Sequence, residues 1–265
     1  EPQSAKEFAE LAQWVNYDGH RSLFESRSPN RKGLLMWMSH SCWPSMVWQT
    51  YDYYFEPTAA YFAIKKASEP LHIQWNPATD EVEVVNYSAG THKGLTAKVQ
   101  ILNMDASVAW EKEATVDSNE DTTNKCIKLA FPANLSKVHF IKMVLTENGK
   151  VVSDNFYHRS LEENNYQDLR QLAKVALQST TTVDKNADGT WSAVSVIENK
   201  TSTPALMIRL NVVGSKDGQQ LLPVFYADNY FSLLPGEKKE VRMSWKDEDT
   251  RGNEGKVLIT GYNVE

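Results

Sequence analysis

From about residue 71 onward, hydrophobic and polar residues of this chain alternate in short runs. Val82 and Val84 flank a glutamate, and Val194 and Val196 flank a serine. Because successive side chains of a β-strand point to opposite faces of the sheet, a period of two predicts strands with one face buried. Many such runs with turn residues between them are typical of antiparallel sandwiches.

The predicted strands fall into two groups, at 71–173 and 174–265. Within the first group, the pair Asn148-Gly149 lies between two alternating runs. Both residues accept positive φ, so the pair predicts a tight hairpin turn. Each group has about the size of an immunoglobulin-like domain. The chain is therefore expected to be mostly β, with two immunoglobulin-like β-sandwich domains.

The first 70 residues follow a different pattern. Ser4 and Glu7 have the spacing of a capping box, and apolar residues then recur at helical spacing to about residue 25. Residues 34–38 form an unbroken apolar run, which suits a strand buried on both faces. Residues 59–67, shortly after Pro57, predict a second helix. We therefore expect a helix, a strand and a helix in this part.

Composition excludes several classes of protein. The 265 residues carry a net charge of −6, which gives no basic surface for nucleic acid. No apolar run reaches the length of a membrane span, so no membrane partner is expected. The two cysteines, Cys42 and Cys126, lie far apart in the sequence. We favour two separate buried thiols over a disulfide.

Aromatic residues are concentrated in one short stretch of the N-terminal part. Such rings can stack on the faces of sugars, and they can also fill a hydrophobic core. For this group we favour core packing. The stretch contains Trp37, Trp43, Trp48, Tyr51, Tyr53, Tyr54, Phe55, Tyr61 and Phe62.

The region from residue 33 to residue 70 is the most specific part of the sequence. It contains Trp43-Pro44-Ser45 after the apolar run, then Asp52-Tyr53-Tyr54, and then the second predicted helix. This order resembles the end of the catalytic barrel in glycoside hydrolase family 2, nearest to the exo-β-glucosaminidase and β-mannosidase branch. The segments 228–231 and 233–237 are similar to the C-terminal immunoglobulin-like domain of the same enzymes.

The resemblance implies both a fold and an activity. Residues 1–70 would be the C-terminal remnant of the catalytic (β/α)8 barrel, with 34–38 as strand eight, and the sandwiches would occupy 71–173 and 174–265. The chain would be the C-terminal portion of a retaining β-glycosidase, which hydrolyses O-glycosyl bonds in carbohydrate metabolism. The family's two catalytic carboxylates would lie upstream of residue 1. We therefore expect no catalytic residue here and no activity of the chain alone.

Substrate-binding residues are predicted from the end of the expected strand eight. Sites of such barrels are built at the C-terminal ends of their strands. His40, Ser41 and Trp43 follow that end, so Trp43 could form one wall of a sugar subsite while His40 and Ser41 bind hydroxyls. A purely structural role for His40 stays open. The exo-glucosaminidase branch is richer in asparagine at the positions of His40 and Ser41, so the resemblance does not fix the sugar.

The acidic residues of the N-terminal part are interpreted as structural. Glu7, Glu10 and Glu25 are expected on a solvated helix face. Asp52 and Glu56 come after the strand-eight loop, where we expect contacts within a loop or at a helix start. None of the five lies at a strand end, so none is a candidate catalytic carboxylate.

One segment matches the opening of a calcium-binding loop. It contains Asp184, Asn186, Asp188 and Gly189, but Ser195 stands where that loop needs a glutamate. We therefore favour a polar turn between strands, and we predict no metal site and no cofactor.

The expected partner is a carbohydrate, a β-glycoside, bound by the full-length protein. The apolar faces of a barrel remnant would also promote association between copies of the chain as a homo-oligomer. The resemblance suggests a secreted or periplasmic protein. Three Asn-x-Ser/Thr triplets, at Asn86, Asn134 and Asn199, decide nothing without a secretion signal. Two alternatives stay open: a non-catalytic carbohydrate-binding module, and a scaffold of immunoglobulin-like domains.

Overall fold

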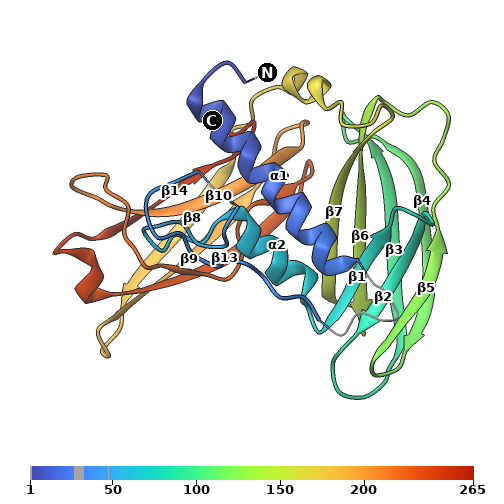
Figure 1. Ribbon diagram of the computed structural model, residues 1–265, viewed down its shortest axis with the longest axis horizontal. Coiled ribbons are helices and arrows are strands. Elements are labelled where there is room, and N and C mark those ends of the chain that lie inside the picture. The colour runs from blue at the N-terminus through green and yellow to red at the C-terminus, as the bar shows by residue number, and fades with distance from the viewer. Residues whose placement is uncertain (1, 27–32, 47) are drawn as a thin grey trace. The chain divides into compact units, whose positions relative to one another are not determined.

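The computed structural model describes residues 2–26, 33–46 and 48–265 (Figure 1). By their contacts the residues divide into two compact units. Residues 66–172 form one, called here the middle unit, and residues 1–65 together with 173–265 form the other, called the terminal unit. The domain boundaries expected at residues 70 and 173 stay a prediction.

The middle unit is an antiparallel sandwich of seven strands among the described residues, in sheets ordered β1-β2-β5 and β4-β3-β6-β7. Its inward side chains form one core that includes Ile73, Ile101 and Ile141, all fully buried. The predicted turn joins β6 to β7, with φ of 51° at Asn148 and 76° at Gly149. The strands are β1 (Leu71–Asn76), β2 (Glu81–Asn86), β3 (His92–Asn103), β4 (Val108–Ser118), β5 (Thr122–Lys128), β6 (Val138–Glu147) and β7 (Lys150–Ser160), followed by the 3-10 helix η1 (Gln167–Gln171).

The terminal unit contains the second sandwich, with sheets ordered β12-β10-β14 and β11-β13-β9-β8. Two sandwiches and a mostly β chain confirm the expected fold class. The elements are β8 (Gln178–Lys185), β9 (Thr190–Glu198), β10 (Ala205–Gly214), β11 (Phe225–Tyr226), β12 (Phe231–Leu233), β13 (Lys238–Lys246), η2 (Asp247–Thr250) and β14 (Gly255–Thr260). Trp245 is 1% exposed at the centre of this core.

The terminal unit also contains the helix α1 (Ala5–Glu25) and all but the last two residues of the helix α2 (Ala59–Ala67). The Ser4 side chain accepts a hydrogen bond from the Glu7 amide, so α1 starts at the predicted N-cap, while the Glu7 carboxylate accepts from the Gln3 amide. In α2, Ala59 and Phe62 belong to the core of the second sandwich. No helix among the described residues is both long and apolar enough to cross a membrane.

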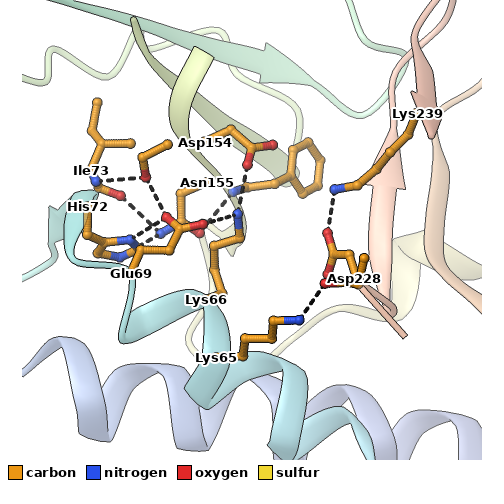
Figure 2. Close-up of polar contacts among 12 residues, drawn as sticks. Lys65, Lys66, Glu69, His72, Ile73, Asp154, Asn155, Asp228 and Lys239 are labelled. Carbon is orange, nitrogen blue, oxygen red and sulfur yellow. Dashed lines mark hydrogen bonds and ion pairs between the residues drawn. The ribbon is translucent and has the colours of Figure 1, made fainter. Parts of the chain in front are cut away.

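Polar contacts also attach α2 to the sandwich of its unit. The Gln13 side chain, from α1, accepts from the Ala59 amide at 2.8 Å and so caps the first turn of α2. Lys65 donates to the Ala227 carbonyl at 2.6 Å, next to the pair of Asp228 and Lys239 (Figure 2). The helix therefore has a fixed place on strands that come about 160 residues later.

The strand expected at residues 34–38 is not formed. These residues carry no strand, and Leu35 and Trp37 are 101% and 84% exposed. A strand needs a neighbour that completes its backbone hydrogen bonds, and no described strand pairs with this segment. The prediction of a buried strand at residues 34–38 was therefore wrong for this chain.

Candidate functional site

Exposed aromatic rings gather on the segment between α1 and α2. Trp43 is 67% exposed and Tyr54 is 58% exposed. The prediction of core packing was wrong for most of the stretch, although it holds for Phe62, which is 2% exposed. We call the exposed set the aromatic surface; its members are Trp37, Trp43, Trp48, Tyr53, Tyr54 and Phe55.

His40 makes two contacts with residues of this surface. Its ring stacks on Phe55, with centroids 4.5 Å apart and planes 16° apart. Its Nε2 lies 3.3 Å from the Tyr53 carbonyl oxygen. Because a carbonyl only accepts, Nε2 carries the proton and Nδ1 presents a lone pair in the neutral ring. The imidazole can thus accept a hydrogen bond from a hydroxyl or an amine.

Ser41 and Trp43 occupy different environments. Ser41 is 3% exposed, and its hydroxyl has no hydrogen-bond partner among the described residues. Trp43 is free to present its ring to a ligand, since two thirds of it is exposed. Neither residue lines the two cavities described below. The substrate-binding roles of His40, Ser41 and Trp43 stay predictions.

A tight turn at residues 52–56 shapes the aromatic surface. One Asp52 carboxylate oxygen accepts from the Tyr54 amide at 2.8 Å and from the Glu56 amide at 2.9 Å. Phe55 adopts a φ of 67° inside the turn, and the Asp52 amide donates back to the Glu56 carbonyl at 3.0 Å. Asp52 is therefore a structural carboxylate, as the sequence predicted.

Glu56 makes the other contact of this turn. Its carboxylate pairs with the guanidinium of Arg209, on β10 of the second sandwich. The pair is mostly buried, with 15% of the Glu56 side chain and 30% of the Arg209 side chain exposed. Sequence reasoning placed Glu56 in a structural contact but had no signal for Arg209, which follows it by more than 150 residues.

Two cavities adjoin the turn. One, of about 360 Å³, is lined by charged groups that include Lys6, Glu56 and Arg209. The other, of about 400 Å³, lies along α1 and is lined by Trp48 and Gln49 among others. The Gln49 side-chain oxygen is buried there without a hydrogen-bond partner among the described residues. Asp52 and Glu56 both line the first cavity, where each carboxylate is already held by the contacts described above.

The remaining sequence candidates have structural explanations. Asp188, in the segment that resembles a calcium loop, accepts from the amide and hydroxyl of Thr190 at 3.0 and 2.6 Å, which makes a polar turn between β8 and β9. No group of three or more possible metal ligands occurs in the described part of the chain. Glu10 lies on an exposed face, but Glu25 is 6% exposed, so the solvated position predicted for Glu25 was wrong.

A second polar cluster lies in the middle unit (Figure 2). Glu69 accepts from the Ser153 hydroxyl at 2.6 Å and lies 3.0 Å from His72 Nδ1. Since Ser153 donates to the carboxylate and not to the imidazole, the serine lacks the base that a nucleophile requires. His72 is also fully buried. We interpret this cluster as structural.

The two cysteines are separate thiols, as expected, but only one is shielded. Cys126 lies partly buried, and its Sγ is 3.4 Å from the Val82 carbonyl. Cys42 is exposed within the aromatic segment, so the prediction that both thiols are buried was wrong for it.

Comparison with known proteins finds relatives that match nearly the whole of this chain. A family described as the exo-β-D-glucosaminidase Ig-fold domain matches residues 155–264. The exo-β-D-glucosaminidase of Streptomyces avermitilis is 31% identical over 99% of this chain. The mannosylglycoprotein endo-β-mannosidase of Lilium longiflorum is 23% identical, also over 99%. The chain spans 32% and 34% of the length of these two relatives.

Solved structures agree with these matches. The exo-chitosanase of Amycolatopsis orientalis superposes with a TM-score of 0.91 and 30% identity, over 99% of this chain and 34% of that one. A variant of that protein has been solved in complex with PNP-β-D-glucosamine. The β-D-mannosidase of Dictyoglomus thermophilum shares the fold, with a TM-score of 0.70 at 17% identity. The chain is therefore homologous to the C-terminal region of the exo-β-glucosaminidase and β-mannosidase branch of glycoside hydrolase family 2.

Proposed function

We propose that this chain acts within a longer retaining β-glycosidase, in which the aromatic surface and His40 form part of the substrate-binding site. The catalytic carboxylates of that enzyme would lie in the polypeptide before residue 1. The second sandwich holds the segment between α1 and α2 through Arg209 and Glu56, and neither sandwich contributes a group to bond cleavage. The substrate class is a β-glycoside with a terminal amino sugar or hexose.

The observation that carries this proposal is the exposure of six aromatic rings on one segment. Large rings are usually buried in a soluble protein, because leaving them in water is costly. Contiguous exposed apolar surface marks a place where something binds. The flat apolar faces of sugars suit such rings, and the free Nδ1 of His40 adds a hydrogen-bond acceptor beside them.

The alternative of a free-standing carbohydrate-binding module finds less support. It requires aromatic rings on the sandwiches themselves. Trp75 and Trp110 pack against the core of the middle unit, and Trp191 and Trp245 stack with parallel planes in the second sandwich. The exposed tryptophans belong to the segment between α1 and α2, which the family resemblance assigns to the barrel.

Hydrolysis of a panel of chromogenic β-glycosides tests the proposal. The 265-residue chain and the longer polypeptide should be assayed side by side. We expect turnover by the longer polypeptide alone, and the substrate that is hydrolysed identifies the sugar. Turnover by the 265-residue chain would contradict the upstream position of the carboxylates.

Single substitutions then test the site. H40A and W43A in the longer polypeptide should each raise KM about tenfold or more with a smaller change in kcat, because both residues are proposed to bind substrate before and during the reaction. F225A is a matched control, since Phe225 is also an exposed ring, 69% exposed, but lies on the second sandwich. An unchanged KM in H40A and W43A would remove these residues from the site.

A further inference from the structure

The second sandwich contacts the candidate site through one buried charge pair. Arg209 lies on β10, whose neighbours in the sheet are β12 and β14, so its backbone is fixed by two strands. Its guanidinium contacts the Glu56 carboxylate and lies 5.9 Å from the centroid of the Tyr230 ring. Tyr230 is itself only 6% exposed, so the cation is supported from the side of the core. Hydrogen bonds between ionised groups are stronger and shorter than neutral ones, and partial burial reduces screening.

Glu56 is the last residue of the turn that carries the exposed rings. Its amide donates to the Asp52 carboxylate and its carbonyl accepts from the Asp52 amide, so the two ends of the turn are tied together. A fixed position of Glu56 therefore also restricts the backbone of Tyr53, Tyr54 and Phe55, which lie between Asp52 and Glu56. A hold on the carboxylate of Glu56 acts on the whole turn.

Residues of this turn also contact the His40 ring. Phe55 stacks on the imidazole and the Tyr53 carbonyl accepts from Nε2. Separate contacts fix the backbone near His40: the Tyr51 amide and the Thr50 hydroxyl both donate to the Ser39 carbonyl at 2.9 Å. These contacts fix the backbone near His40 but do not orient its ring, which depends on residues 53 and 55.

We propose that Arg209 is a positioning residue for substrate binding: through Glu56 it holds the turn at 52–56, and through that turn it orients the His40 imidazole and the rings of the aromatic surface. The C-terminal sandwich thereby sets the geometry of the sugar site without touching the sugar. The inference rests on the proposed function for its effect on substrate, but the mechanical link from Arg209 to His40 does not depend on it.

The link is tested on the 265-residue chain by NMR of the His40 ring. The ring protons of His40 lie over Phe55, so their chemical shifts report the stacking. We expect R209A, R209Q and E56Q to move these signals, and R209K, which keeps a cation, to restore them in part. R242A is the matched control, because Arg242 pairs at 3.0 Å with Glu240 on the same sandwich but with 77% of its side chain exposed.

Two results decide the link. His40 signals that stay in place in folded R209A and E56Q, as in R242A, would overturn it. If R209A fails to fold, E56Q and R209K carry the test, because they keep most of the volume and hydrogen-bonding capacity of the pair. Circular dichroism of each variant shows whether it is folded.

Kinetics of the longer polypeptide test the consequence. We expect R209A to raise KM about tenfold with kcat changed less, because loosened groups near a substrate cost affinity and orientation. R209K should recover part of the loss, and R242A should leave both constants unchanged. Moved His40 signals together with an unchanged KM would show that Arg209 positions the ring but that the ring does not serve substrate binding, which overturns the functional half. Activity on no β-glycoside at all would instead contradict the proposed family function.

Discussion

At the scale of single residues, two buried asparagines hold corresponding places in the two sandwiches. Asn86 ends β2 and Asn199 follows β9, and both are 0% exposed. Each side-chain amide donates to two backbone carbonyls, at 3.1 and 3.2 Å for Asn86 and at 2.9 and 3.0 Å for Asn199. We expect N86A and N199A each to lower the free energy of unfolding by about 3 kcal/mol, because buried carbonyls would lose their donors.

N134A is the control for this prediction. Asn86, Asn199 and Asn134 each begin an Asn-x-Ser/Thr triplet, but Asn134 is exposed. Its effect should stay within about 0.5 kcal/mol. Urea denaturation monitored by fluorescence measures all three variants. Losses in N86A and N199A as small as that of N134A would contradict a structural role. The triplets looked like glycosylation acceptors in the sequence, and only burial shows that two of them serve the fold.

The cysteines give a second prediction at this scale. Burial raises the pKa of the Cys126 thiol to about 11, whereas Cys42 is exposed. Because the thiolate is the reactive form, Cys42 should react quickly with a disulfide reagent at about pH 8 and Cys126 slowly. Absorbance of the released thiol checks this. C42S should abolish the fast phase, and a fast phase that survives in C42S would contradict the assignment, while denaturant should expose both thiols.

At the scale of elements, the sequence predicted most of what is local. The alternation of apolar and polar residues predicted strands in both sandwiches. The spacing of Ser4 and Glu7 predicted the start of α1, and Asn148-Gly149 predicted a hairpin turn. Such signals come from neighbours in the chain. The cap that Gln13 places on α2 and the pair between Glu56 and Arg209 join residues 46 and 153 positions apart, for which a single sequence has no pattern.

The strand predicted at residues 34–38 is the opposite case: the sequence has a clear local signal, but the structure has no strand there. The unbroken apolar run is typical of a buried strand, but strand formation is decided by hydrogen-bonded partner strands and not by the segment itself. The same cause explains the aromatic stretch. Phe62 is buried because α2 meets a core, while Trp37 and Trp43 lie on a segment that meets none among the described residues. The substrate-binding roles of His40, Ser41 and Trp43 stay predictions, and the burial of these side chains could not be predicted from the sequence alone.

The segment that leads into β1 supplies a prediction about pH. Burial acts to raise the pKa of Glu69, but the hydrogen bond from His72 and the charge of Lys66, together with Ser153, outweigh it, so the pKa lies below its usual 4.5 (Figure 2). A carboxyl whose pKa falls on folding adds stability above its unfolded pKa, and this contribution is lost as pH falls through the folded value. We expect E69Q to cost about 2 kcal/mol at pH 7 and progressively less below about pH 4.5.

Urea titrations at several pH values measure that difference. E113Q is the control, because Glu113 is an exposed carboxylate on β4 of the same sandwich, and its small effect should not vary with pH. An E69Q penalty that is constant from pH 7 to pH 3 would show that the carboxylate charge does not stabilise the fold.

At the scale of the whole molecule, the exposed apolar side chains predict association between copies. α1 presents Val15 and Leu23, 71% and 53% exposed, and the following segment presents Leu35, Trp37 and Met46. Soluble monomers rarely leave so many large apolar groups in water, and the net charge of −6 is a modest opposing force spread over 265 residues. The chain in isolation should therefore form dimers or larger species as its concentration rises.

Sedimentation velocity over a wide range of concentration measures this. The triple variant L35S/W37S/M46S should shift the distribution toward monomer without loss of the β-sheet signal in circular dichroism. F225S is the matched control, because Phe225 is 69% exposed but lies on β11, away from the segment 33–48 in the sequence. If F225S dissociates the assembly as well as the triple variant does, the contact lies on the sandwich. A chain that is monomeric throughout would mean that these side chains find no partner in a second copy, which leaves the remainder of the proposed barrel as the surface they are built to meet.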